Sequence, residues 1–270
     1  MNSLKKAYLI SITFILLLGW TGICVAYEDS QKTIEFDLKN FYYDYNEVQS
    51  GEWLDSEKGW LTGTNFIFKN QNLDTHGYWQ IVYDLTIDNT HYNGFYLGTN
   101  QPCQSITATE LTTLAFAYAN PVNKNTYVSV GLGYHSWDRI LGEYQEEVYS
   151  WFYIPLGLRW EIGAGDRLEG AIDITARIMF AGRMTGYNTG YNDFNVKLGS
   201  KPGYRIALPL TYRLTSQWAF AITPWYEYSS IGESNSVPWY QTDGSYEGDV
   251  YEPSSTTRQY GINIGTRLYF

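Results

Sequence analysis

The chain has 270 residues, a formal net charge of −10 at pH 7 and an isoelectric point near 4.8. This acidic balance excludes a general nucleic-acid-binding role, because phosphate contacts require a basic surface. Aromatic residues make up 18% of the chain and 26 residues are Tyr, a side chain that, like Trp, favours the boundary between a membrane and water.

The first predicted element is a secretory signal peptide over residues 1–26. Two lysines precede an apolar run over 9–18, and the segment closes on the small residue Ala26. An uncleaved membrane anchor is the alternative. Cleavage after Ala26 would keep 16 of the 18 basic residues and all 28 acidic residues, for a net charge of −12. Cys103 would then be the one cysteine left, which excludes an intramolecular disulfide.

Residues 27–270 are predicted to form a single domain of β-strands. Apolar and polar residues alternate with a period of two, which is typical of a strand between two different environments. After the signal no segment approaches the ~20 apolar residues of a membrane helix. A membrane protein with this pattern is predicted to be a closed antiparallel barrel. The alternating segments are 32–45, 59–69, 77–88, 107–119, 126–137, 148–162, 168–180, 204–214, 218–228 and 260–270.

The connections between these segments alternate in length, as periplasmic turns and extracellular loops do in outer-membrane barrels. This phase places both ends of the barrel on the periplasmic side. We predict about ten strands, within a range of about eight to twelve. The short connections are 70–75, 120–125, 163–167 and 215–217, and the long ones are 47–58, 89–106, 138–147, 183–203 and 229–258.

The polar face of the strands supplies the candidate site residues. Acids and bases nearly balance there, so we expect them to pair across the lumen and, in so small a barrel, to fill most of it. The alternative is a narrow polar pore. The predicted lumen charge network consists of Glu35, Asp37, Lys39, Arg159, Glu161, Glu169, Asp173, Arg177, Arg205, Arg213, Glu227 and Arg267, and Glu110 is expected on the same face.

Two resemblances support this fold. The end of the chain resembles the C-terminal signal of bacterial outer-membrane β-barrels, polar-x-Gly-x-x-apolar-x-aromatic, which implies insertion by the barrel-assembly machinery. The matching residues are Asn263, Gly265, Leu268 and Phe270. Segments 43–45, 133–139 and 147–157 resemble uncharacterised Gram-negative outer-membrane β-barrel domain proteins. That resemblance implies the fold and the location and supplies no catalytic residues.

His135 is the candidate for general-base chemistry, because it is expected near the outer rim and acidic residues follow it. Omptin proteases have a similar strand number and use an Asp-x-His pair, which we expect this chain to lack. Lipid A deacylases use His-x-Ser on a late strand. Here Ser136 directly follows His135, so the two side chains are predicted to point to opposite faces. We therefore expect no catalytic residues and no enzyme.

The long loops, especially 229–258, combine aromatic residues with small polar ones, a composition that suits surface recognition. The leading hypothesis is a monomeric outer-membrane barrel with a packed charged lumen, acting in surface binding or as an envelope structural component. The alternatives are a narrow porin-like channel for small polar solutes and a hydrolase centred on His135. Outer-membrane lipid and lipopolysaccharide are the expected partners. The acidic stretch 243–249 lacks calcium-loop spacing, so no metal and no cofactor is expected.

Overall fold

The computed structural model describes residues 30–95, 101–142, 145–163, 165 and 167–270, and the predicted signal peptide lies outside them. Within these ranges the structure contains no helix with the length and apolarity needed to span a bilayer. The strands are β1 Ser30–Gln49, β2 Glu52–Asn72, β3 Tyr78–Phe95, β4 Pro102–Asn123, β5 Thr126–Leu141, β6 Gln145–Gly163, β7 Leu168–Asn188, β8 Phe194–Lys197, β9 Gly199–Ser200, β10 Pro202–Ala207, β11 Leu210–Arg213, β12 Trp218–Gly232, β13 Val237–Tyr240, β14 Tyr246–Val250 and β15 Ser254–Tyr269.

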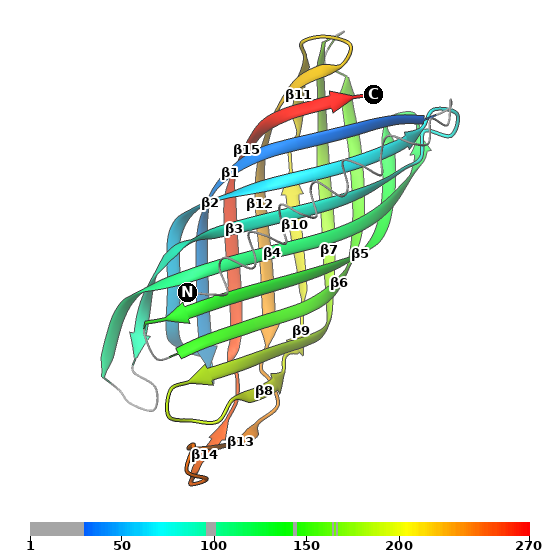
Figure 1. The fold of residues 1–270 in the computed structure, drawn as a ribbon. Coiled ribbons are helices and arrows are strands. Elements are labelled where there is room, and N and C mark those ends of the chain that lie inside the picture. Colours follow the sequence, from blue (N-terminus) through cyan, green and yellow to red (C-terminus); the bar gives the residue numbers. More distant parts are fainter. Residues whose placement is uncertain (1–29, 96–100, 143–144, 164, 166) are drawn as a thin grey trace. The chain divides into compact units, whose positions relative to one another are not determined.

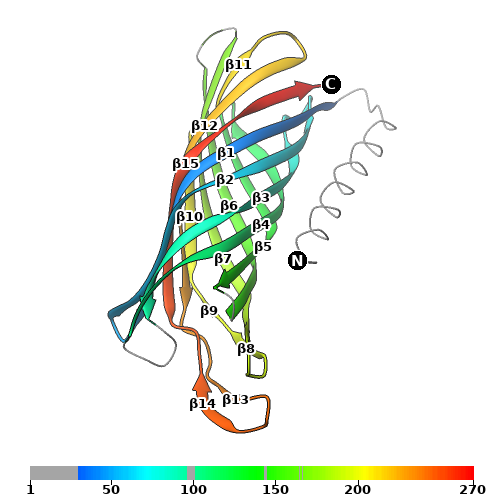
Figure 2. The ribbon, with the colours of Figure 1, turned by 60° about the vertical axis from the view of Figure 1, so that its left-hand side comes forward.

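Thirteen of these strands form one closed antiparallel barrel with 10 strand positions, and β13 and β14 form a separate two-stranded sheet (Figures 1 and 2). Strands β1 to β7 follow one another around the wall, β10 and β11 share the next position, and β12 and β15 complete it. Strand β15 closes the barrel because it pairs with β12 on one side and β1 on the other, so that Tyr260 lies between Tyr226 and Tyr42. The predicted fold class and strand number are confirmed.

The wall position shared by β10 and β11 is interrupted at Pro209. Proline has no N–H to donate to a neighbouring strand, so a continuous ladder is impossible there. The flanking backbone keeps the wall closed, because Leu208 N donates to Pro224 O at 2.9 Å and Ala171 N donates to Pro209 O at 3.0 Å.

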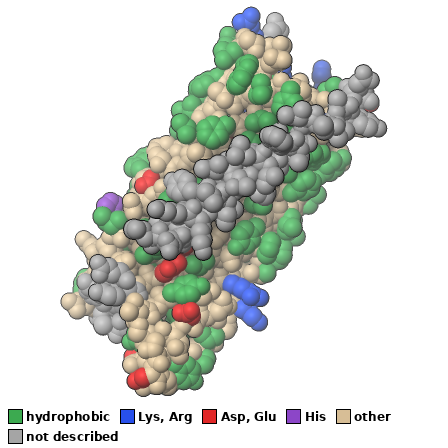
Figure 3. All heavy atoms as spheres, in the orientation of Figure 1, with side chains coloured by type: hydrophobic (Ala, Val, Ile, Leu, Met, Phe, Trp, Pro, Cys, Tyr) green, Lys and Arg blue, Asp and Glu red, His purple; other side chains and the backbone are tan. Residues whose placement is uncertain are grey.

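The two faces of the wall follow the alternation in the sequence. On β6, Phe152, Ile154 and Leu156 point outward and are 38–44% exposed, while Arg159 and Glu161 line the lumen. Figure 3 shows hydrophobic side chains distributed along the outer wall of the barrel. Such an outer face is favourable in contact with lipid.

An aromatic cluster marks one edge of this apolar band. Outward-facing Tyr42, Trp60 and Tyr260 contact one another, with ring centroids 5.5–6.3 Å apart. Beyond them, toward the β1–β2 turn, the outer face becomes polar and carries an ion pair between Lys58 and Asp44 at 3.2 Å. Because Tyr and Trp favour the membrane–water boundary, we place the extracellular boundary at this cluster. The strand ends beyond it lie outside the membrane.

In the part of the chain that the structure describes, all five predicted long loops consist mostly of strand, so their expected bounds were wrong. Strands β1 and β2 are joined by a tight turn at Ser50 and Gly51, with φ of 52° and 86°. Strands β3 to β6 likewise continue through most of 89–106 and 138–147. Hydrophobic alternation does not reveal these extensions, because their inner faces bury polar side chains such as Glu57 and Thr107, both 0% exposed.

The seam between β1 and β15 requires a residue without a side chain at Gly265, where a Cβ would overlap the Asp37 carboxylate and the Phe36 carbonyl. We expect Gly265→Val to lower the free energy of unfolding by about 1–3 kcal/mol. Urea titration and heat-modifiable gel migration measure this loss. Gly163→Ala is the control, since a Cβ there meets nothing within 4 Å. An equal loss in both variants would contradict the special role of the seam.

Candidate functional site

A cavity of about 810 Å³ occupies the periplasmic half of the lumen, and we call it the cup. It extends from the turn residue Asn125 and the last residue of β6, Gly163, at the periplasmic mouth to Leu111, His135 and Tyr153 further up the barrel. Every residue of the predicted lumen charge network lines it. This half of the lumen therefore has charged side chains around an open centre, whereas the sequence predicted that side chains fill most of it.

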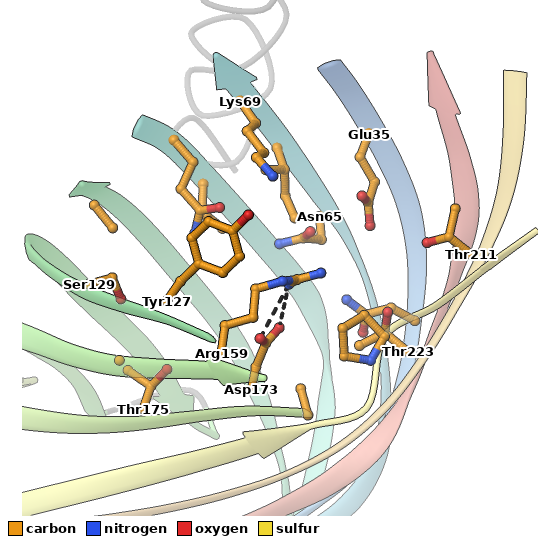
Figure 4. Close-up of a pocket in the computed structure, with 18 of the residues that line it drawn as sticks. Glu35, Asn65, Lys69, Tyr127, Ser129, Arg159, Asp173, Thr175, Thr211 and Thr223 are labelled. Atoms are coloured by element: carbon orange, nitrogen blue, oxygen red, sulfur yellow. Dashed lines mark hydrogen bonds and ion pairs between the residues drawn. The ribbon is translucent and has the colours of Figure 1, made fainter. Parts of the chain in front are cut away.

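Charged side chains in the cup pair mainly along the wall. Arg159 Nη1 lies 3.0 Å from the Asp173 carboxylate on the neighbouring strand (Figure 4). Arg267 Nε donates to Glu35 at 2.6 Å across the closing seam. In both pairs the strand register places the two residues opposite each other. Because partners on adjacent strands satisfy one another, the centre of the cup stays open.

Other ion pairs link more than two neighbouring strands of the wall. Glu227 on β12 pairs with Arg177 on β7 and with Arg205 on β10. Lys39 on β1 donates to Asp84 on β3 at 2.7 Å, across the intervening strand β2. Asp84 was missing from the predicted network, although the alternation of 77–88 places it on the inner face. Arg213 Nε donates to Glu169 at 2.6 Å.

Glu110 is the one residue of the expected inner face that points the other way. It shares its face of β4 with Leu114 and Phe116, which are 39% and 47% exposed, whereas Leu111 on the opposite face is 6% exposed. The expectation was wrong because β4 carries Thr and Ala on both faces over much of its length. Alternation of hydrophobicity therefore does not distinguish its two sides.

Above the cup, a layer of aromatic side chains fills the lumen. Trp137 stacks on Tyr149 with ring centroids 4.7 Å apart, and it contacts Tyr45 at 4.8 Å and Tyr43 at 6.1 Å. All four side chains are at most 2% exposed. A neighbouring void of about 40 Å³ has room for a few waters at most. We call these four residues the aromatic layer, and it separates the cup from the extracellular end.

On the extracellular side of this layer, Arg139 is surrounded by buried carboxyl groups. Its Nη2 lies 2.7 Å from Glu57, and its Nη1 lies 3.2 Å from both Glu47 and Glu147. Arg139 is 2% exposed. We call this group, with Asp55 and Glu252, the Arg139 cluster. It was not predicted, because all of its members fall in segments expected to be solvated loops.

The Arg139 cluster contains more acid than base, so some of its carboxyl groups must stay protonated. The Tyr149 hydroxyl lies 2.9 Å from Glu147 and 2.7 Å from Glu252. That hydroxyl has one proton to donate, so making both hydrogen bonds requires a proton on one carboxyl. Burial, and then the charges of Glu47 and Glu147, raise the pKa of Glu252 well above its usual value. Among the residues described, no group of His, Cys, Asp and Glu has metal-binding geometry.

Asp55 gives this cluster a pH dependence. Burial, and then the nearby Glu47, raise the pKa of Asp55 from 3.8 to about 8. Between these values the folded protein holds a proton that the unfolded chain has lost. The free energy of unfolding therefore falls as the pH rises from about 4 to about 8.

We accordingly expect wild-type stability to drop between pH 5 and pH 8, by on the order of a few kcal/mol. Asp55→Asn should show a shallower drop, because it cannot titrate. Urea titrations at a series of pH values measure both slopes. Asp44→Asn, on the outer face, is the control and should keep the wild-type slope. Parallel curves for wild type and Asp55→Asn would refute the assignment.

His135 lies inside the barrel at the top of the cup rather than at the outer rim. Its Nδ1 is 2.7 Å from Thr113 Oγ1, and its ring centroid is 4.5 Å from that of Trp151. Ser136 follows on the other face of β5, and its hydroxyl donates to the backbone of Tyr149 at 3.4 Å. His135 and Ser136 therefore do not form a nucleophile–base pair.

The expected lack of an Asp-x-His sequence was wrong, since Asp74, Thr75 and His76 form one. The three residues lie in the exposed turn between β2 and β3, where His76 has a φ of 57°. That turn is at the periplasmic end of the barrel, opposite the extracellular rim. The motif is therefore remote from the Arg139 cluster and from the surface loops.

No protein-family model and no curated protein sequence matches this chain. Solved structures of outer-membrane β-barrels do resemble it. The outer membrane protease OmpT from Escherichia coli aligns with a TM-score of 0.57 and 8% identity, over 90% of this chain and 97% of that one. OprG from Pseudomonas aeruginosa gives 0.38 and 12%, over 90% and 96%. AlkL gives 0.35 and 14%, over 91% and 92%. The similarity to OmpT shows a shared fold and transfers no activity.

Proposed function

We propose that this outer-membrane β-barrel is a surface-binding protein that presents a rigid extracellular hairpin, and that its lumen does not conduct. The observation that carries the proposal is the way in which the β13–β14 hairpin is attached. It projects beyond the barrel wall at the end opposite the C-terminus (Figures 1 and 2). Its base is nonetheless packed against the segment between β7 and β8.

Trp239 provides this attachment. Its ring stacks on Tyr191 with centroids 4.1 Å apart, and its Nε1 donates to the backbone oxygen of Asn192 at 3.2 Å. Beyond this anchor, Tyr240 and Tyr246 contact each other at 5.6 Å and remain 39% and 60% exposed. An aromatic pair held in place binds a partner with little loss of conformational entropy. This geometry supports recognition of a surface ligand.

The lumen supports a non-conducting role. A solute would have to cross the aromatic layer and then the Arg139 cluster, both of which are buried and mutually packed. The cup is the observation that favours the alternative of a narrow channel, since it is polar and reaches the periplasmic mouth. Passage would require the packed extracellular half of the lumen to open.

We further propose that the protein is a monomer that contacts outer-membrane lipid and lipopolysaccharide. The outward apolar band supports the contact with lipid. In the proposed insertion signal, Leu268 lies on the outer face of β15, and Phe270, which follows the strand, is 51% exposed. Asn263 faces the lumen, where it accepts a hydrogen bond from Trp225 Nε1 at 2.8 Å.

Conductance tests the lumen directly. We expect the refolded mature protein to give no discrete current steps in a planar bilayer, because the aromatic layer blocks the path. Heat-modifiable migration establishes that the inserted protein is folded. Discrete steps from folded wild-type protein would overturn the non-conducting role and favour the channel.

Binding tests the hairpin. Lipid vesicles carrying the protein are applied to a glycan array and to immobilised lipopolysaccharide, where wild type is expected to bind at least one surface. Replacing Tyr240 and Tyr246 together by Ser should weaken that binding by about tenfold or more, because a few aromatic side chains typically carry most of the binding energy of an interface. Tyr187→Ser removes another exposed tyrosine (40% exposed) and is the control. Equal binding by all variants would refute the role of the hairpin.

A further inference from the structure

We propose that the cup binds a small hydroxylated anion, such as a sugar phosphate or a sugar acid, between Lys69, Arg159 and Asn65. This site is independent of the proposed surface function. It opens toward the periplasmic mouth, whereas the hairpin projects from the extracellular end, and the aromatic layer lies between them.

The charge of the cup differs from that of the rest of the protein. Its lining carries eight Lys and Arg side chains against seven Asp and Glu. The whole chain has 18 basic against 28 acidic residues. A concave, membrane-enclosed wall with this balance concentrates anions relative to the acidic outer surface.

Lys69 supplies a positive charge that no carboxylate of the described wall pairs with. In the part of the chain that the structure describes, no carboxylate lies within 4.0 Å of its ammonium group. Its contact is instead with the face of Tyr78, whose ring centroid is 4.0 Å away. An enclosed cation without a counter-ion is unfavourable, so an anionic ligand would gain a charge-assisted bond there.

Arg159 extends this anion site toward the centre of the cup. Its Nη1 donates a hydrogen bond to Asp173. Its Nε has no hydrogen-bond partner among the described groups, although the Glu161 carboxylate lies 3.5 Å from it. Figure 4 shows the Lys69 and Arg159 side chains entering the same space from opposite parts of the wall. Two cationic groups around one space suit a phosphate or carboxylate.

Asn65 indicates that the ligand also carries a donor. It lies four residues before Lys69 on the same inner face of β2 and is 6% exposed. Its Oδ1 is buried and has no hydrogen-bond partner within the described ranges. A buried acceptor in that state is costly unless a ligand or water donates to it. A hydroxyl group beside the anionic group would satisfy it.

The size of the cup agrees with such a ligand. Its volume of about 810 Å³ falls within the roughly 300–1,000 Å³ of small-molecule sites. Hydroxyl groups of Ser129, Thr175 and Thr223 surround the same space (Figure 4). They add neutral donors and acceptors that the hydroxyl groups of a sugar could use.

Isothermal titration calorimetry on the refolded barrel in detergent tests the site with glucose 6-phosphate, inorganic phosphate and glucose. We expect glucose 6-phosphate to bind more tightly than phosphate, and glucose not to bind. Lys69→Met should weaken the binding of glucose 6-phosphate by about tenfold or more, since a charge-assisted hydrogen bond is lost. Asn65→Leu should reduce the affinity for glucose 6-phosphate to the affinity for phosphate. The affinity for phosphate itself should stay unchanged.

Lys197→Met is the matched control, because it removes the same charge from an exposed position on β8. It should bind as wild type does. The site is refuted if folded wild type fails to bind glucose 6-phosphate, or if Lys69→Met binds it unchanged. Equal weakening in Lys69→Met and Lys197→Met would also refute it, since that would show a response to net charge alone. Heat-modifiable migration identifies which variants are folded.

Discussion

Closure of the sheet by pairing β15 with β1 is the constraint on which the rest of this structure depends. In lipid every backbone N–H and C=O must be satisfied within the protein, and an open sheet edge would leave a full row of them unpaired. The seam runs from Thr33 opposite Tyr269 to Val48 opposite Ser254. Its register sets which side chains meet across it, so Glu35 and Arg267 face the lumen side by side and neutralise one another.

Closure also creates an enclosed space, and the chain fills that space in three different ways. The cup is lined by ion pairs that lie along the wall and leave its centre open. The aromatic layer around Trp137 is packed through ring contacts, with little room for water. The Arg139 cluster satisfies a surplus of carboxyl groups through one guanidinium, two tyrosine hydroxyls and retained protons. Each level therefore has its own response to charge and pH.

This division separates the two ends of the barrel structurally. Glu252 belongs to the segment that follows β14, and its bond to Tyr149 ties that segment to the interior of the extracellular half. The surface hairpin is thus attached to a rigid base, while the cup communicates with the opposite end. Under the two proposals, a ligand at either end would meet a preformed surface, with the packed half of the lumen between them.

The sequence alone determined the elements whose cause is local. Alternation with a period of two predicted a barrel of about ten strands, the outward face of β6, and the inner face that holds Glu35 and Arg159. Where both faces of a strand carry similar residues, as around Glu110, the local pattern did not show which face points into the lumen. The Asp74–His76 motif shows a further limit, because a short pattern does not indicate at which end of a barrel it lies.

Tertiary structure decided everything that depends on partners distant in the sequence. Arg139 meets Glu47 and Glu57 only because β5 and the β1–β2 hairpin enclose the same lumen, so two polar segments that look like solvated loops become buried strand. Strand register likewise chose the partner of each lumen charge and left Lys69 without one among the described residues. Burial of a polar group is a property of its surroundings, and those surroundings exist only after the barrel has closed.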